Sequence, residues 1–330
     1  ANYVAHCVVR MTHRDYTYVP DRANKTNGAD INNVQSVDIK AKAILNMENS
    51  SGGIVAANIT NAGSVHMGTG NIELTATLTN TGTLNMISNT KNTVTAGTYA
   101  GTGGNLRLDY DVTSGGKTDH LTLTNSSGSI TLDSGWIIGN LTGTNSVTSQ
   151  VFANAFAGTL TGGSAIDNKG YIYTVTPNDD KKKVTIAKTL KKYNLYEIIG
   201  DKVRYNTKTH PGVAFEYNME GNETVSDYSD NTNATAGTIS SLGTLTPVDS
   251  MEREFTLNGN NHTLNGNGKG GMLVNGNNIL NLENMTITDF KSSTRGGFVE
   301  VSGSASLNVD NVTFIANQTT ATAGGAIHIS

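Results

Sequence analysis

The sequence predicts an all-β fold in which short strands stack turn upon turn as a parallel β-solenoid. Three observations predict it: abundant glycine with scarce proline, apolar residues in alternation, and repeats of regular length. The 330 residues include 37 glycines but only 4 prolines. Glycine and asparagine between strands supply the positive-φ corners that tight turns need. We therefore expect short strands joined by corners that carry Gly or Asn.

Apolar and polar residues alternate in many short segments, for example at Ile72–Leu74 and Leu106–Leu108. Alternation of period two, with Thr and branched residues, is typical of half-buried strands. Few segments carry the 3.6-residue apolar stripe of an amphipathic helix. The chain is therefore expected to be nearly all β.

Internal repeats indicate the solenoid. Residues 58–67 are echoed by residues 77–86, so that Asn61 corresponds to Asn80 at an offset of 19. Near the end of the sequence, residues 284–288 recur at 311–315 and residues 296–301 recur at 324–329, at offsets of 27 and 28. One such unit cannot bury its apolar face alone, whereas stacked units share a continuous core.

Differences in composition and in repetitiveness divide the sequence into four parts. Residues 1–50 are the least repetitive and predict an N-terminal cap, which protects the first open edge of a repeat fold. Residues 51–187 predict a first solenoid stretch. Residues 188–250 carry more tyrosine and charge and predict a seam or inserted subdomain, with a linker as the alternative. Residues 251–330 carry the clearest repeats, and we expect this pattern to continue beyond the end of the sequence.

Charge and cysteine content bound the function. The 23 basic and 27 acidic residues give a net charge of −4, so no basic excess favours binding to nucleic acid or to an anionic membrane surface. Cys7 is the only cysteine, which excludes an internal disulfide but leaves pairing with another chain open. No apolar run is long enough for a membrane-spanning helix, and no charged-then-apolar signal segment is found at Ala1.

The last repeats resemble a known family. Phe314-Ile315-Ala316-Asn317 followed by Gly324-Gly325-Ala326-Ile327 resembles the paired FxxN and GGA(I/L/V) repeats of polymorphic outer-membrane proteins. The resemblance implies an autotransported bacterial adhesin with a right-handed parallel β-helix passenger. The preceding repeat departs from the pattern, because Phe298 stands where the motif has Ala, and Ser293 where it has Asn.

The middle of the chain looks like an autotransporter passenger in general. Tyr99-Ala100-Gly101, then residues 104–108, 118–123 and Gly128, resemble the YxG…GxLxL…DxLxV…G pattern of that family. In the family this block precedes the translocating barrel, whereas here a second repetitive stretch follows. The two resemblances cover about half of the chain. They imply a secreted or surface location, a host-cell or glycan receptor, and a membrane connection only through an absent translocator or anchor. The open ends of the solenoid predict self-association along its axis.

An enzyme is the main alternative, because β-helices host many polysaccharide lyases and hydrolases. Glycoside cleavage needs two carboxylates across a groove. Asp109 and Asp111 lie two residues apart, which places both on one face of a strand. A solvated strand end is the simpler interpretation of this pair. Asp179 and Asp180, beside three lysines, predict the charged turn of a hairpin.

No cofactor or metal set emerges from the sequence. His6, Cys7 and His13 match no common zinc spacing. We expect structural roles for the motif residues: Phe314 and Ile327 fill the interior, Asn317 caps a corner, and the glycines form the turn. The sequence therefore predicts a non-catalytic adhesin or fibre-forming scaffold. The alternative is a carbohydrate-binding or carbohydrate-cleaving β-helix, such as a phage tailspike or polysaccharide lyase.

Overall fold

The computed structural model describes ten segments of the chain: residues 9–13, 16–18, 24–26, 30–48, 50–200, 216–228, 239–245, 254–293, 296–321 and 324–330. These residues divide into two compact units. Unit 1 takes the residues up to 167 and residues 171–190, and unit 2 takes residues 168–170 and those from 191 onward. Strands dominate both units, so the predicted all-β class is confirmed. The described residues form one α-helix, α1 (Leu195–Ile199), and one 3₁₀ turn, η1 (Val225–Asp227).

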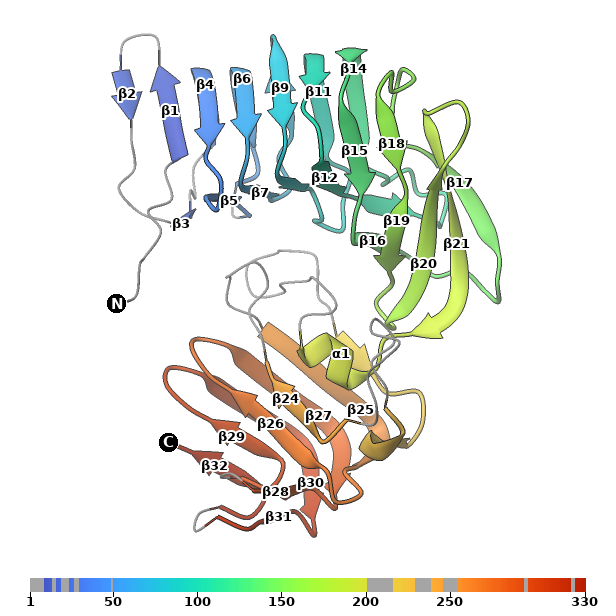
Figure 1. Ribbon diagram of the computed structural model, residues 1–330. Coiled ribbons are helices and arrows are strands. Elements are labelled where there is room, and N and C mark those ends of the chain that lie inside the picture. Colours follow the sequence, from blue (N-terminus) through green and yellow to red (C-terminus); the bar gives the residue numbers. More distant parts are fainter. Residues whose placement is uncertain are drawn as a thin grey trace. The chain divides into compact units, whose positions relative to one another are not determined.

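Unit 1 is built from three sheets within its described residues (Figure 1). The first sheet has the order β14 (His120–Ser126), β11 (Thr93–Ala100), β8 (Ile72–Leu74), β6 (Ile54–Asn61), β4 (Ile31–Ile39), β1 (Val9–His13) and β2 (Tyr16–Tyr18), with β9 (Thr77–Asn80) beside β11 and β6. The second has the order β18 (Thr159–Thr161), β15 (Ser129–Leu132), β12 (Gly104–Arg107), β10 (Thr83–Asn85), β7 (Ser64–Met67), β5 (Ile44–Met47) and β3 (Asn24–Thr26). The third has the order β13 (Asp109–Asp111), β16 (Gly135–Ile138), β19 (Gly163–Ile166), β20 (Tyr171–Pro177), β21 (Lys183–Lys192) and β17 (Ser146–Gln150).

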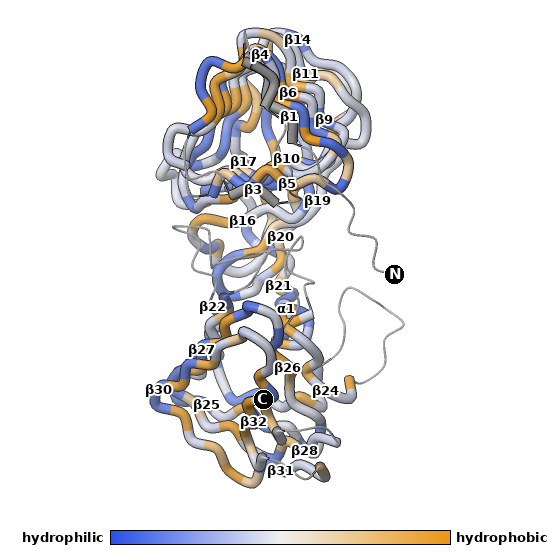
Figure 2. Tube along the Cα trace, turned by 90° about the vertical axis from the view of Figure 1, so that its left-hand side faces the viewer, coloured by the Kyte–Doolittle hydropathy of each residue, from blue (hydrophilic) through white to orange (hydrophobic). Residues whose placement is uncertain are grey.

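Strands from successive repeats pair in parallel and bury the same position each time. Ile54, Ile72, Val94 and Leu121 are neighbours in register across β6, β8, β11 and β14, and all four are buried. Viewed along the stack, the strands of successive repeats lie behind one another (Figure 2). The predicted offset of 19 is confirmed, because Asn61 is the register partner of Asn80. Each repeat therefore adds one rung to a continuous apolar column.

Glycines at the corners allow successive repeats to approach closely. Gly128 has φ +82°, and a Cβ atom there would lie 1.8 Å from the carbonyl oxygen of Gly101. At Gly158, one repeat later, a Cβ atom would lie 2.2 Å from the carbonyl oxygen of Gly128. The N–H group of Ser129 donates to Gly101 O at 2.9 Å. The corner is thus tight because backbone packs on backbone.

Unit 2 contains only parallel pairs among its described strands. One sheet has the order β22 (Glu216–Asn218), β25 (Glu254–Asn265), β27 (Ile279–Thr288) and β30 (Ser306–Ile315), with β23 (Glu223–Thr224) beside β25. A second has the order β24 (Ser241–Thr244), β26 (Gly270–Val274), β29 (Val299–Val301) and β32 (Ile327–Ile329). β28 (Lys291–Ser292) pairs with β31 (Gln318–Thr319).

The predicted offsets of 27 and 28 are the registers of unit 2. Leu280 pairs with Leu307 across β27 and β30, and Val299 pairs with Ile327 across β29 and β32. Asparagines mark the bends within the long strands: Asn284 and Asn311 both adopt positive φ, at 50° and 52°. This agrees with the expected use of Asn at corners.

The family-like motif residues lie in the last repeat of unit 2. The ring of Phe314 is half-buried, 6.3 Å from that of Phe298. Asn317 accepts a hydrogen bond from the N–H of Phe290 at 3.2 Å and donates to the carbonyl of Ile287 at 2.9 Å. The remaining motif residues form the turn and the last strand: Gly324 has φ +71°, Gly325 and Ala326 accept hydrogen bonds from Gly297 and Phe298, and Ile327 is half-buried beside Val299.

Parallel strand pairs also occur within residues 1–50 and within residues 188–250. β3, β4 and β5 lie within residues 1–50 and pair in parallel with later strands, whereas β1 pairs antiparallel with both β2 and β4. β22 and β24 likewise lie within residues 188–250 but pair in parallel with β25 and β26. The sequence of β4 does not show a regular apolar alternation, because three of its positions between Ile31 and Val37 are exposed and polar.

The predicted hairpin of unit 1 is confirmed. β20 and β21 are neighbours in the third sheet, and the N–H of Asn178 donates to Lys183 O at 2.9 Å across the turn. The carboxylate of Asp180 accepts hydrogen bonds from the N–H groups of Lys182 and Lys183. This carboxylate therefore organises the turn.

Candidate functional site

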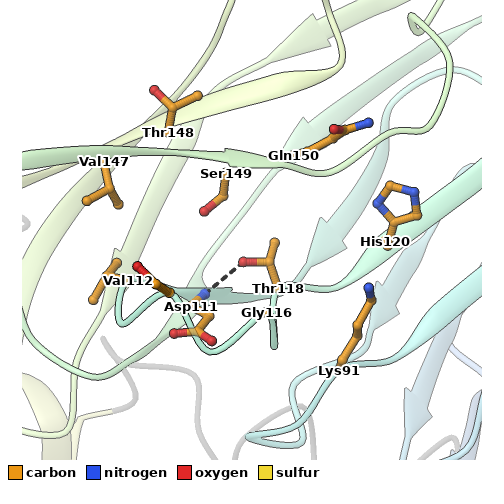
Figure 3. A pocket seen from close by; sticks show the side chains of 11 residues that line it. Lys91, Asp111, Val112, Gly116, Thr118, His120, Val147, Thr148, Ser149 and Gln150 are labelled. Carbon is orange, nitrogen blue, oxygen red and sulfur yellow. Dashed lines mark hydrogen bonds between the residues drawn. The ribbon is translucent and has the colours of Figure 1, made fainter.

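A polar groove of about 430 Å³ lies on unit 1, between the loop Asp111–Thr118 and strand β17 (Figure 3). Lys91 and His120 stand at one end of it. Ser149 and Gln150 belong to β17, the strand that faces the loop across the groove. The groove thus collects residues from three repeats that are distant in sequence.

The sheets fix both sides of the groove. A parallel bridge joins Leu121, at the start of β14, to Phe152, just after β17, and Leu121 N–H donates to Val151 O at 2.8 Å. β17 pairs antiparallel with β21 at the edge of the third sheet. This strand is therefore held from two directions.

Asp111 organises the floor loop of the groove. Its Oδ1 accepts hydrogen bonds from the N–H and the hydroxyl of Thr113 at 2.7 and 2.6 Å, and its Oδ2 accepts from the N–H of Lys117 at 2.9 Å. Thr118 Oγ1 accepts from Asp111 N–H at 2.9 Å, as drawn in Figure 3. Burial opposes ionisation of Asp111, but the bonds from Thr113 and Lys117 outweigh it and lower the pKa of Asp111. Its negative charge is thus held by the loop itself.

Lys91 and His120 are the cationic and titratable side chains at the end of the groove. His120 is the register partner of Thr93, so the two side chains come from consecutive repeats. Within the described residues, neither side chain makes a hydrogen bond or an ion pair. They are therefore available to a ligand.

Hydroxyl and amide groups line the rest of the groove. The Nε2 group of Gln150 donates to Phe152 O at 3.1 Å, which leaves its Oε1 atom as an acceptor. The Thr118 oxygen accepts from Asp111, and its proton remains to be donated. Ser149 adds a further hydroxyl. Such a lining can form several hydrogen bonds with one polar ligand.

Two fully buried carboxylates, Asp109 and Asp119, lie within two residues in sequence of the groove residues Asp111, Thr118 and His120. Asp119 Oδ2 accepts from Asp109 N–H at 2.8 Å, and its Oδ1 accepts from Asn92 N–H at 2.7 Å. Asp109 Oδ2 accepts from Ser88 N–H at 2.8 Å. We call these four residues, Ser88, Asn92, Asp109 and Asp119, the buried polar network.

Asn92 ties the network to an earlier repeat. Its Nδ2 group donates to Gly68 O at 2.8 Å and to Gly70 O at 2.6 Å, and its Oδ1 accepts from the Ser88 hydroxyl at 2.6 Å. All hydrogen-bonding groups of this side chain are therefore satisfied. Such a network specifies how three repeats align.

Burial changes the titration of both carboxyl groups. Burial raises the pKa of Asp109 to about 8, although N–H groups of residues 88–90 lower it in part. Burial and the charge of Asp109 together raise the pKa of Asp119 well above its usual range. Two close carboxylates in an apolar interior cannot both ionise readily. Burial thus disfavours the charged form of both carboxyl groups, and the positive charge of Lys91 opposes this by lowering the pKa of Asp119 in part.

Trp136, the only tryptophan of the chain, packs over this network. It is the register partner of Asp109, and its indole N–H donates to Asn89 Oδ1 at 3.1 Å. The side chain is buried. Its fluorescence is therefore a natural reporter of this region.

The chain was compared with known proteins in three ways. No family model, no curated protein and no solved structure matches it. The likeness to autotransporter passengers and polymorphic outer-membrane proteins thus remains a prediction from motifs. Within the described residues, no helix is both long and apolar enough to cross a membrane. The same residues contain no cluster of three or more His, Cys, Asp or Glu arranged for a metal ion.

The structure separates the two aspartates that the sequence placed together. Tyr110 belongs to the hydrophobic core, and Asp109 and Asp111 on either side of it are also buried. Their carboxylates serve different networks, however, because Asp109 joins Ser88 and Asp119 whereas Asp111 closes its own loop. Asp111 is also mostly buried, which corrects the expectation of a solvated strand end.

Sequence reasoning missed Asp119, Lys91 and His120. Asp119 occupies the Asp position of the DxLxV-like block, and this was the one signal that could have identified it. Lys91 carries no signal of its own, since it lies in a polar turn. His6 and Cys7 lie outside the described residues, as does the side chain of His13.

Proposed function

We propose that this chain is a right-handed parallel β-helix in two stretches, acting as an adhesin or structural scaffold without catalysis. The observation that carries the proposal is the register: equivalent residues of successive repeats are partners in both units. A crossover between parallel strands of one sheet is right-handed in about 98% of cases, which supports the handedness.

An extended stack of this kind suits display. Successive strands lie about 4.8 Å apart, so that each exposed position repeats as a regular row. Stacked repeats provide the long surfaces that repeat proteins use for binding. The motif resemblances support a secreted or bacterial cell-surface location and a host-cell or glycan receptor. Membrane attachment would require a translocator or anchor, and nucleic acid is not an expected partner.

Self-association along the stack is part of this proposal. Edge strands with free backbone groups pair readily with another chain. Light scattering over a range of concentrations should therefore show reversible oligomers, and a strict monomer would contradict this part.

Adhesion is tested with beads that carry the purified chain. Saturable attachment to epithelial cells or to an immobilised glycan panel is expected, together with intact glycans by mass spectrometry after long incubation. Beads coated with heat-unfolded chain are the control. Release of shorter saccharides would contradict a non-catalytic role, and equal attachment by the unfolded control would contradict adhesion.

A carbohydrate-binding protein is the second candidate function. The polar groove of unit 1 favours it, because Lys91, His120 and several hydroxyl groups face one open site. Cleavage is less well supported than binding. The carboxylate nearest to the groove, Asp111, has both oxygens bound to its own loop.

A further inference from the structure

We infer that the groove between loop Asp111–Thr118 and β17 binds an acidic saccharide, with the anionic group at Lys91 and His120. This inference deepens the proposed adhesive function and rests on it for the choice of a saccharide. It assigns a ligand class and named contacts to one site.

The charges around the groove favour an anion. Lys91 and His120 have no hydrogen-bond or ion-pair partner among the described residues. The facing carboxylate, Asp111, accepts three hydrogen bonds from Thr113 and Lys117, and Lys117 adds positive charge to the same loop. Charge-assisted hydrogen bonds from Lys and His⁺ to carboxylate or sulfate are about twice as strong as neutral ones.

The buried carboxylates do not oppose an anion strongly. Burial raises the pKa of both Asp109 and Asp119, and this bias toward their neutral forms limits the negative potential next to Lys91. The Ser88 and Asn92 N–H groups further stabilise the remaining charge. The field at the end of the groove therefore stays favourable to an anionic group.

The rest of the lining favours a polyhydroxylated ligand over a simple ion. Ser149, Thr118 and the free Oε1 of Gln150 provide donors and acceptors along the groove. The volume of about 430 Å³ lies within the usual range of small-molecule sites, roughly 300–1,000 Å³. An inorganic anion would use only the Lys91 end.

Titration calorimetry tests the inference with four probes. An oligogalacturonate supplies carboxylates, a heparin oligosaccharide supplies sulfates, maltohexaose is neutral, and inorganic sulfate is the simple ion. We expect at least one acidic oligosaccharide to bind, and to bind more tightly than maltohexaose or sulfate. The acidic oligosaccharide that binds more tightly shows whether the groove prefers a carboxylate or a sulfate group.

The double variant Lys91→Met/His120→Gln should weaken this binding roughly ten-fold or more, since it removes the charge-assisted contact of Lys91 and the ring N–H contact of His120. Lys42→Met removes one exposed positive charge elsewhere on unit 1 and is the matched control, with affinity unchanged. Unchanged Trp136 fluorescence verifies that each variant is folded.

Three results would overturn the inference: no acidic oligosaccharide binds, maltohexaose or sulfate binds equally well, or the double variant retains full affinity. The bead assay separates this failure from failure of the proposed function. Attachment that persists in the double variant places the adhesive surface outside the groove. Loss of groove binding together with no attachment by the wild-type chain would remove both proposals.

Discussion

Unit 1 and unit 2 use the same parallel register but place their polar residues differently. In unit 1, Asn61 donates to Asn80 at 2.9 Å inside the protein, and Asp109 and Asp119 are fully buried. In unit 2 the corresponding rungs lie on the surface, where Asn308 donates to Asn281 at 2.8 Å. The interior of unit 2 is filled mainly by apolar side chains, and its buried polar residues among those described are Glu197, Asn278 and Ser292.

This difference shows that the same asparagine–asparagine hydrogen bond contributes differently to stability when it is buried and when it is exposed. A buried rung whose partner is removed leaves an unsatisfied polar group, whereas an exposed rung is replaced by water. Unit 1 should therefore be more sensitive to polar substitution and to pH than unit 2. Both units should be equally sensitive to the loss of apolar volume.

The largest expected effect is common to both units. Leu121→Ala in unit 1 and Leu280→Ala in unit 2 each remove a fully buried side chain, and each should lower the free energy of unfolding by about 2–5 kcal/mol. Urea unfolding measures this loss. Trp136 fluorescence reports only on unit 1, and far-UV circular dichroism reports on both. If Leu280→Ala shifts the Trp136 transition as much as Leu121→Ala does, the two cores are not independent.

Replacing a corner glycine should give the next largest loss of stability. Gly128→Ala forces a Cβ atom onto Gly101 O at positive φ and should cost about 2–4 kcal/mol. Gly268→Ala in unit 2 also has positive φ, at 76°, but its Cβ atom would meet nothing within 4 Å, so about 1 kcal/mol is expected. Thermal unfolding of the two variants measures the contrast. Equal losses would show that the close approach at Gly128 is unimportant.

A smaller effect should separate the two ladders. Asn61→Ala removes bonds to Asn80, Thr83 and Gly63 in the interior and should cost about 1–3 kcal/mol. Asn308→Ala removes an exposed rung and should cost less than about 0.5 kcal/mol. Urea midpoints provide the test, and a reversed order would refute the distinction between buried and exposed rungs.

The stability of unit 1 should also depend on pH more strongly than the stability of unit 2 does. The folded-state pKa of Asp109 is raised to about 8, so the stabilising effect of its proton is complete below about pH 4, the value of the unfolded chain, and is lost as pH rises to about 8. The slope is at most about 1.4 kcal/mol per pH unit for each proton. The urea midpoint read from Trp136 should fall between pH 5 and pH 8.

Asp109→Asn mimics the protonated acid and is the matched variant for this titration. It should reduce the pH dependence without abolishing it, because Asp119, whose pKa is also raised by burial, is still present, and it should leave unit 2 unchanged. An undiminished slope in Asp109→Asn would assign the effect to another group.

Much of the fold could be predicted from particular repeats. The 27-residue recurrence at Asn284 and Asn311 is the register of β27 and β30, and the 19-residue offset at Asn61 is that of β6 and β9. Both predictions are confirmed because equivalent apolar residues of successive repeats share one buried core and must therefore pair in register. β4 was missed because exposed polar residues interrupt its apolar pattern.

The candidate site was much less predictable. The groove depends on the bridge between Leu121 and Phe152, a long-range contact that no local pattern encodes. Spacing alone suggested Asp109 with Asp111, whereas the fold joins Asp109 to Asp119 across ten residues. Strand alternation indicates which face a side chain occupies, but hydrogen-bonding partners depend on how the turns fold.

The in-register stacking of repeats is the central claim, and thiol cross-linking tests it most directly. In a chain with Cys7→Ser, cysteines replace Thr95 and Thr122, which are register partners on the exposed side of β11 and β14. Dibromobimane joins only thiols within a few ångströms and then fluoresces. The account predicts efficient cross-linking of Thr95→Cys/Thr122→Cys and little for the out-of-register pair Thr95→Cys/Thr124→Cys. Equal cross-linking of the two pairs, or a preference for the second, would contradict it.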